Sequence, residues 1–345
     1  MAKTATYRVT VDGADITSKL DPLLISLTIN DQAGTHSDTA DLELDDSDGV
    51  LLMPKAGAEI EIELGWQGEG MSAVFKGKVD EVRSKGARGG GRTLSITAKG
   101  IDTLGKTKQP QTKHLDNTSL KDALTEVGKG AGVTDVRVDP KLASIVREYW
   151  SVDAESFLHF GQRIAREVGG TFKVQGTRAV LALRNGGKSP GGAVLPAFHA
   201  VWGENLIAWA IAPIVGRPRV KKVKARFYDA KEAKWKKVEA DVEDEDAEAE
   251  HTHRHAGADE GEAKGRTDSD KATSEREKGE GTVQVDGSAE PRPEGTCILQ
   301  GARRGADGTY RIDAVKHTAG RGGWTTELTL KQPQDSAGKD TRRAK

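Results

Sequence analysis

Three histidines alternate at positions 251, 253 and 255, inside the acidic stretch EDAEAEHTHRHAGADE (245–260). On a β-strand, His251, His253 and His255 would share one face and could bind a single metal ion. On a helix, only His251 and His255 would be neighbours. The spacing therefore makes a metal-dependent hydrolase centred on these three residues one hypothesis for the function.

The order of the residues argues against that hypothesis. The H-x-H-x-D-H motif of metallo-β-lactamase-type hydrolases matches only at its start, because Arg254 and His255 break the pattern. Those enzymes also need αββα layers, whose strands and helices are not visible here, and short histidine motifs often arise by chance. We favour a solvated loop whose histidines offset an acidic run. A structural metal is the second interpretation and a catalytic metal the third, so we predict no catalytic residue, no cofactor and no metal ligand.

Two single residues also have reactive side chains. His317 has no Ser, Cys or carboxylate constellation around it in sequence, so we expect a hydrogen-bonded histidine at the end of a hairpin. Cys297, the only cysteine, lies in the strand-like run TCIL and is expected to be a buried thiol. A single cysteine cannot form an intrachain disulfide, which fits assembly in a reducing cytoplasm.

The segment RPRVKKVKARFYDAKEAKWKK (217–237) contains ten Lys or Arg residues interleaved with Phe227, Tyr228 and Trp235. This composition is typical of a nucleic-acid-binding surface. The segment also fits a hairpin that turns at Asp229-Ala-Lys-Glu and has one solvated face. Because 52 basic and 53 acidic residues leave a net charge of −1, no global field would attract nucleic acid or an anionic membrane. We favour a solvated face or a subunit interface over specific nucleic-acid binding.

Period-two alternation of apolar residues dominates both ends of the chain. In residues 1–107, short alternating runs such as GAEIEIELGW are separated by Gly, Asp and Pro clusters, which predicts an antiparallel β domain. In residues 108–192, SLKDALTEVGKGAGV and SVDAESFLHFGQRIAREVGG have helical spacing and a short hairpin turns at Gln175-Gly176, which predicts a small α+β domain. Strands resume over 193–334.

A polar insertion interrupts this last domain at about 239–282. It has almost no large apolar residue, so it could not offset its ordering entropy without a partner, although a helix through DKATSEREK fits the sequence. We expect a disordered tail over 335–345. No apolar run is long enough to span a membrane, and the N-terminus lacks the apolar core of a signal peptide.

Several stretches in this order resemble one family, the phage late control gene D proteins, which are baseplate hubs of contractile tails. The similar segments are LELDDSDGVLLMPKAGAEIEIELGW, VFKGKVDEV and LSITAKGID in the first domain, the two helical stretches in the middle, and GTYRIDAVKHTAGRGGWTTELTL at the end. The insertion at 239–267 has no counterpart in this pattern. The hairpins near the ends of the two β domains also resemble each other, which is a weak sign of duplication.

The resemblance implies a mainly β fold, in which two tube-like antiparallel β-barrel domains flank the small α+β domain. It implies a non-enzymatic homotrimer in the baseplate of a virion tail or phage-like particle, assembled in the bacterial cytoplasm. The implied partners are the tail tube protein, a separate trimeric spike protein, the tape-measure protein and baseplate wedge proteins, with no membrane. The same fold forms the upper half of type VI secretion spike proteins. In a trimer, two histidines of each chain could also surround the axis and bind a structural metal.

Overall fold

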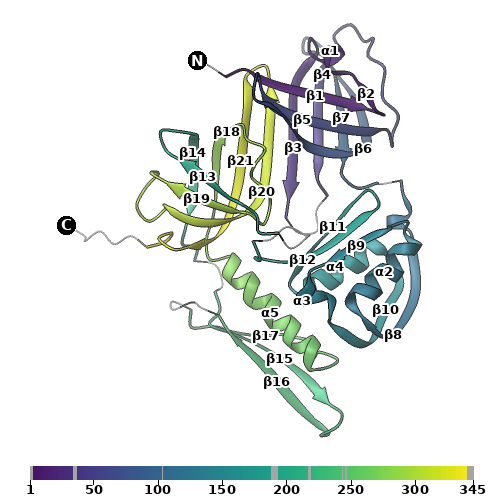
Figure 1. Ribbon diagram of the computed structural model, residues 1–345, viewed down its shortest axis with the longest axis vertical. Helices are drawn as coiled ribbons and strands as arrows, with labels where there is room; N and C mark the ends of the chain where they lie inside the picture. Colours follow the sequence, from purple (N-terminus) through teal and green to yellow (C-terminus); the bar gives the residue numbers. More distant parts are fainter. Residues whose placement is uncertain are drawn as a thin grey trace, which may run out of the picture.

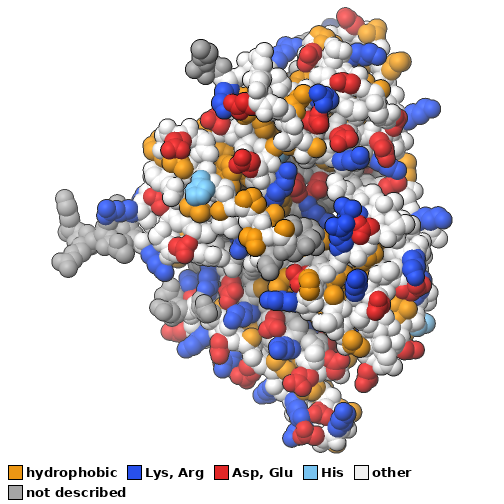
Figure 2. Space-filling view, in the orientation of Figure 1, with side chains coloured by type: hydrophobic (Ala, Val, Ile, Leu, Met, Phe, Trp, Pro, Cys, Tyr) orange, Lys and Arg blue, Asp and Glu red, His pale blue; other side chains and the backbone are white. Residues whose placement is uncertain are grey.

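The computed structural model describes residues 3–33, 37–102, 104–187, 193–216, 219–242, 244 and 247–339. Two groups of β-strands lie side by side, a small α+β unit lies below them, and a helix with a long hairpin forms the lower end of the molecule (Figure 1). The described chain is mainly β, as the sequence predicts. Positive and negative side chains are interspersed over the visible face (Figure 2), as expected for a net charge of −1.

The first group of strands comes from the alternating segments of residues 5–99. Its elements are β1 (Ala5–Val11), β2 (Ala14–Asp15), α1 (Thr17–Leu20), β3 (Leu24–Gln32), β4 (Thr39–Asp45), β5 (Glu59–Trp66), β6 (Gly70–Ala87) and β7 (Gly91–Lys99). Ile60, Ile62 and Leu64 of β5 are buried, and the glutamates between them are more exposed. Successive side chains of a strand point to opposite faces, so this alternation places one face of each strand in a common core.

The last group of strands has its own core. Its elements are β13 (Ala197–Val201), β14 (Leu206–Ala212), β18 (Glu280–Asp286), β19 (Thr296–Gln300), β20 (Gly308–Gly320) and β21 (Gly323–Gln334). Val283, Val285, Leu328 and Leu330 are fully buried there. The turn at 335–339 also packs on this core through Ala337. We expect a disordered tail from 335 onward, and this first part of it is ordered instead.

The two groups share one hydrogen-bonded sheet. Strand β20 pairs antiparallel with β3, and this pairing joins both groups into a 13-stranded sheet whose path runs from β14 to β2. Trp324, at the tip of the β20–β21 hairpin, enters the first core and lies 5.4 Å from the ring of Trp66. The described strands thus form one continuous sheet over two cores, because β20 is long enough to pair with β3 beyond its own core.

The α+β unit covers residues 106–183. Its elements are the 3₁₀ turn η1 (Lys106–Lys108), β8 (Pro110–Ser119), α2 (Leu120–Gly130), β9 (Asp135–Val138), α3 (Pro140–Ala143), β10 (Val146–Ser156), α4 (Phe157–Glu167), β11 (Gly170–Gln175) and β12 (Arg178–Leu183). Ser119 caps α2 and Ser156 caps α4 by accepting a backbone N–H of the first turn. The second helix begins at Phe157 rather than Ser151, because residues 151–156 continue strand β10.

The basic segment forms the hairpin of β15 (Lys222–Asp229) and β16 (Lys234–Asp241), and the polar insertion that follows contains the short strand β17 (Glu250–Thr252) and helix α5 (Glu260–Arg276). The helix is longer than the sequence predicts, and polar contacts tie it to two neighbouring parts of the chain. Ser269 donates to the carbonyl of Arg166 (2.8 Å), and the Arg276 guanidinium lies 2.6 Å from Asp313. Helix α5 is therefore held between the α+β unit and the second strand group. No helix within the described ranges is long and apolar enough to cross a membrane.

Candidate functional site

The histidine segment lies at the edge of the three-stranded sheet formed by β16, β15 and β17. His251 is in β17, which runs parallel to β15 with His251 opposite Val223. Its Nε2 lies 3.6 Å from the carboxylate of Asp270 on α5. The rings of His251 and His253 are 6.5 Å apart. Strand β17 ends at Thr252, so the three histidines do not continue along one strand face.

No metal centre is formed by the part of the chain that the structure describes, because no group of three or more His, Cys, Asp or Glu side chains there could hold a metal ion. The side chains of His251 and His255 are exposed, and His255 contributes its carbonyl oxygen to a hydrogen bond from Arg266 (3.2 Å). The hydrolase hypothesis therefore gains no support from the geometry.

His317 is buried at the junction between β20 and the first core. Its Nδ1 lies 3.0 Å from the Thr326 hydroxyl. That hydroxyl also accepts the Ser288 N–H (3.0 Å) and donates to the Ser288 carbonyl (3.2 Å), so we assign the proton of the neutral imidazole to Nδ1. Burial, with a smaller contribution from the charge of Arg292, lowers the pKa of His317 to about 4. A neutral, enclosed imidazole with these partners has a structural role.

Cys297 is fully buried in β19 within the second core. Burial raises the pKa of its thiol to about 12. A nucleophilic cysteine needs a lowered pKa and access to substrate, and Cys297 has neither. The expected buried thiol is confirmed.

The basic segment forms the β15–β16 hairpin, with Asp229 at the turn accepting the backbone N–H groups of Lys231 and Glu232. Arg217 lies outside the described residues. Several lysines form ion pairs with carboxylates of the same chain, among them Lys222 with Glu239 (3.2 Å) and Lys236 with Asp229 (2.5 Å). This pairing neutralises much of the charge that a polyanionic ligand would need.

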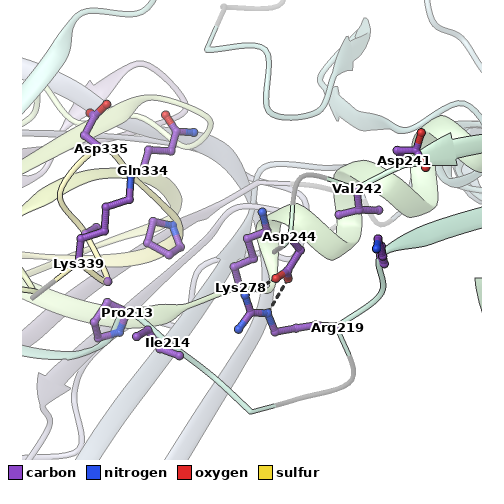
Figure 3. A pocket seen from close by; sticks show the side chains of 14 residues that line it. Pro213, Ile214, Arg219, Asp241, Val242, Asp244, Lys278, Gln334, Asp335 and Lys339 are labelled. Carbon is purple, nitrogen blue, oxygen red and sulfur yellow. Dashed lines mark hydrogen bonds and ion pairs between the residues drawn. The ribbon is translucent and has the colours of Figure 1, made fainter. Parts of the chain in front are cut away.

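An open groove of about 1090 Å³ lies between the turn after β21 and the chain before β15. Figure 3 shows Gln334, Asp335 and Lys339 on one side and Arg219, Asp244 and Lys278 on the other. The Arg219 guanidinium donates to the buried Asp244 carboxylate at 2.6 Å. The described lining contains no His, Cys or Ser.

One charged cluster is invisible to sequence reasoning. Lys173 of β11 lies 2.6 Å from a carboxylate oxygen of Asp31 and 2.7 Å from one of Asp38, and so ties the α+β unit to the first strand group. Burial, reinforced by the charge of Asp31, raises the pKa of Asp38 to about 7. Although burial opposes it, the two carboxylates also raise the pKa of Lys173. Lys173 is 142 positions from Asp31 and 135 from Asp38, so no local pattern connects the lysine with the two carboxylates.

Comparison with known proteins places these features in a family context. Residues 36–323 match the family model described as phage tail baseplate hub (GPD). The chain is 31% identical over 169 residues to the probable baseplate hub protein of Escherichia phage 186, a match that covers 49% of this chain and 42% of the relative. The chain spans about half the length of the curated relatives that it matches.

Solved structures share the fold. A 43 kDa tail protein of prophage MuSo2 from Shewanella oneidensis is similar with a TM-score of 0.70 at 14% identity, over 95% of this chain and 98% of that one. An E. coli protein described as a component of the type VI secretion system is similar with a TM-score of 0.58 at 11% identity, over 97% of this chain and 79% of that one. At these identities the likeness is one of fold.

Proposed function

The chain belongs to the phage tail baseplate hub family, and we propose that it is the structural hub that joins the tail tube to the central spike as a homotrimer. The family match over residues 36–323 is the observation that carries the proposal. In this proposal, residues 1–107 and 193–334 are two tube-like β-barrel domains that flank the α+β domain of 108–192. The protein acts in the virion tail baseplate, without catalysis and without a cofactor.

The free ends of the sheet support assembly into a ring. Strand β14 has the sequence LIAWAIA, carries no charge, and stands at one end of the strand order, where β18 is its paired strand. One isolated bridge joins its first residue, Leu206, to Trp202. Soluble proteins usually protect such edges with charges, bulges or covering segments. An uncharged edge strand is therefore well suited to contact a neighbouring subunit.

The other end of the sheet has a different character. Strand β2 pairs with only Thr10 and Val11 of β1, and Arg8 carries a charge on the part of β1 beyond it. A third end of the described sheet is β13, which lies off this path and pairs with β19. Unlike ends favour a heterologous, head-to-tail contact, which closes into a ring when the rotation between subunits permits. Three copies would then present six barrels, which match the sixfold tail tube on one side and a trimeric spike on the other.

The partners follow from this position. We expect contacts with the tail tube protein and a spike protein, and further contacts with the tape-measure and wedge proteins. The test is native mass spectrometry of the purified full chain, alone and with the spike protein of the same particle, followed by cryo-electron microscopy of the assembled tail. A threefold ring at the junction of tube and spike is the expected result. A strictly monomeric chain in both samples would refute the proposal.

A further inference from the structure

The β15–β16 hairpin extends away from the body of the molecule beside α5 (Figure 1). Its inner face is occupied, because Ala225 and Phe227 pack on Ala263 of α5. The outer face carries four cross-strand pairs, which in order toward the turn are Lys222 with Asp241, Lys224 with Glu239, Arg226 with Lys237, and Tyr228 with Trp235. Only the outer face is available to another molecule.

In the first two of these pairs the charges are opposite, and in the third they have the same sign. Lys222 and Asp241 form an ion pair at 3.6 Å, and Lys224 and Glu239 form one at 3.9 Å. Arg226 and Lys237 are like charges placed directly opposite each other, an arrangement that destabilises an isolated hairpin. Within the described ranges, neither of these two side chains has a carboxylate partner. Such a local cost is expected where a residue serves a contact outside the chain.

The fourth pair adds exposed aromatic surface. Tyr228 and Trp235 are 46% and 60% exposed, with ring centroids 5.5 Å apart. The Arg226 guanidinium lies 5.4 Å from the Trp235 ring. Trp, Tyr and Arg are the residues that contribute most of the binding energy at protein interfaces. We call Arg226, Tyr228, Trp235 and Lys237 the hairpin tip, and its composition fits an anionic protein surface that also offers an aromatic or apolar contact.

The same chain carries a surface with the complementary composition. On the outer face of the β8–β10 pair, Tyr149 is 50% exposed and its ring stacks on His114, with centroids 5.8 Å apart. Asp116 lies directly opposite Tyr149, and the exposed Asp153 lies further along β10, at the register shift between Val152 and Glu155. Among the described residues, neither carboxylate has a cationic partner. We call His114, Asp116, Tyr149 and Asp153 the β8–β10 face.

We propose that the hairpin tip of one copy docks on the β8–β10 face of the next copy in the trimer, so this inference rests on the proposed function. Two uncompensated cations then meet two uncompensated carboxylates, and the exposed aromatic pair packs on Tyr149. Each copy gives one tip and receives one, as a closed heterologous ring requires. A nucleic acid fits the tip less well, because its phosphates would have to pass Asp229, Glu239 and Asp241 beside it.

Cysteine cross-linking tests this contact directly. The only native thiol, Cys297, is buried, so an engineered pair has little background. The double variant Trp235→Cys/Tyr149→Cys is expected to form intermolecular disulfides that give dimer and trimer bands on a non-reducing gel. The matched control is Trp235→Cys/Leu52→Cys, which uses the 93% exposed Leu52 of the first strand group and is expected to give no ladder. Protection of Cys297 from thiol reagents verifies that each variant is folded.

Charge exchange provides a second test that leaves the aromatic residues in place. Two double variants reverse the charges, Arg226→Glu/Lys237→Glu on the tip and Asp116→Lys/Asp153→Lys on the β8–β10 face. Each is expected to raise the concentration at which the trimer half-dissociates by about tenfold or more. The chain with all four substitutions is expected to return to the wild-type concentration. A native trimer that shows neither the ladder nor the rescue would overturn the docking proposal and leave the hub assignment standing. A chain that stays monomeric alone and with its spike would overturn both.

A nucleic-acid role is a further outcome of the same variants. If Arg226→Glu/Lys237→Glu abolished binding of a 40-mer single-stranded DNA and left the half-dissociation concentration of the trimer unchanged, and if Trp235→Cys/Tyr149→Cys gave no ladder, the tip would be a nucleic-acid site. That result would also overturn the docking proposal.

Discussion

Replacement of His317 by Asn should change how the stability of the protein depends on pH. The imidazole is buried, and its pKa is about 4 instead of the ordinary 6.5. Because the folded chain binds this proton less readily than the unfolded chain, the contribution of His317 to stability is complete above pH 6.5 and is lost as the pH falls toward 4. Between pH 7.5 and 4.5 the loss amounts to about 2 to 3 kcal/mol. Asn keeps a donor near Thr326 but does not titrate.

The assay is urea unfolding at pH 7.5 and pH 4.5, followed by the fluorescence of tryptophans such as Trp324, whose ring lies 5.9 Å from that of His317. Other groups also titrate, so the informative quantity is the difference between wild type and variant at each pH. The wild type should lose about 2 to 3 kcal/mol more than His317→Asn on acidification. His199→Asn, on the exposed His199 of β13, serves as the control and should follow the wild type. Equal losses in wild type and His317→Asn would refute the argument.

Three other changes test the packing and charges described above. Burial and Asp31 raise the pKa of Asp38 to about 7, so ionisation of Asp38 lowers the free energy of unfolding as the pH rises from about 4 to 7. Over that range the free energy of unfolding of Asp38→Asn should therefore increase relative to that of the wild type in the same urea titrations. Gly161→Ala in α4 would place a Cβ 2.3 Å from the Phe172 ring, and thermal unfolding should show a net loss of about 1–3 kcal/mol despite the better helix propensity of Ala. Cys297 should react with a thiol reagent at pH 8 only as fast as the chain opens. The rates of labelling and of unfolding are measured in parallel, and labelling faster than unfolding would contradict the burial of Cys297.

The sequence predicts the local structure of this protein well where burial follows a short period. The alternation of β5 and the turn at Gln175-Gly176 appear as expected, and the Ser119 cap of α2 is a signal of the same local kind. In each case the signal depends on residues within a few positions of one another, through side-chain alternation, a capping hydroxyl or a flexible turn residue. The fold class is recoverable from such signals because they occur throughout both ends of the chain.

Long-range polar contacts explain what the sequence does not predict. Helix α5 has almost no apolar face, so neither its length nor its position can be read from periodicity. It is held by contacts such as Arg276 with Asp313, 37 positions away, and Arg184 with Thr273, 89 positions away. The joining of both strand groups through β20 and β3 likewise depends on pairing between residues nearly 300 positions apart.

The candidate site shows a related limit of motif reasoning. His251, His253 and His255 have the composition of a metal site, but the end of β17 at Thr252 removes the common strand face that the motif needs. A structural hub has its function on extended surfaces, where no few residues stand out by type. The informative features are then mismatches visible only in the folded chain, such as the like-charged pair of Arg226 and Lys237 and the uncharged edge of β14. Each is a local cost in the isolated chain that a neighbouring subunit would remove, and for that reason both features belong to the assembly proposed above.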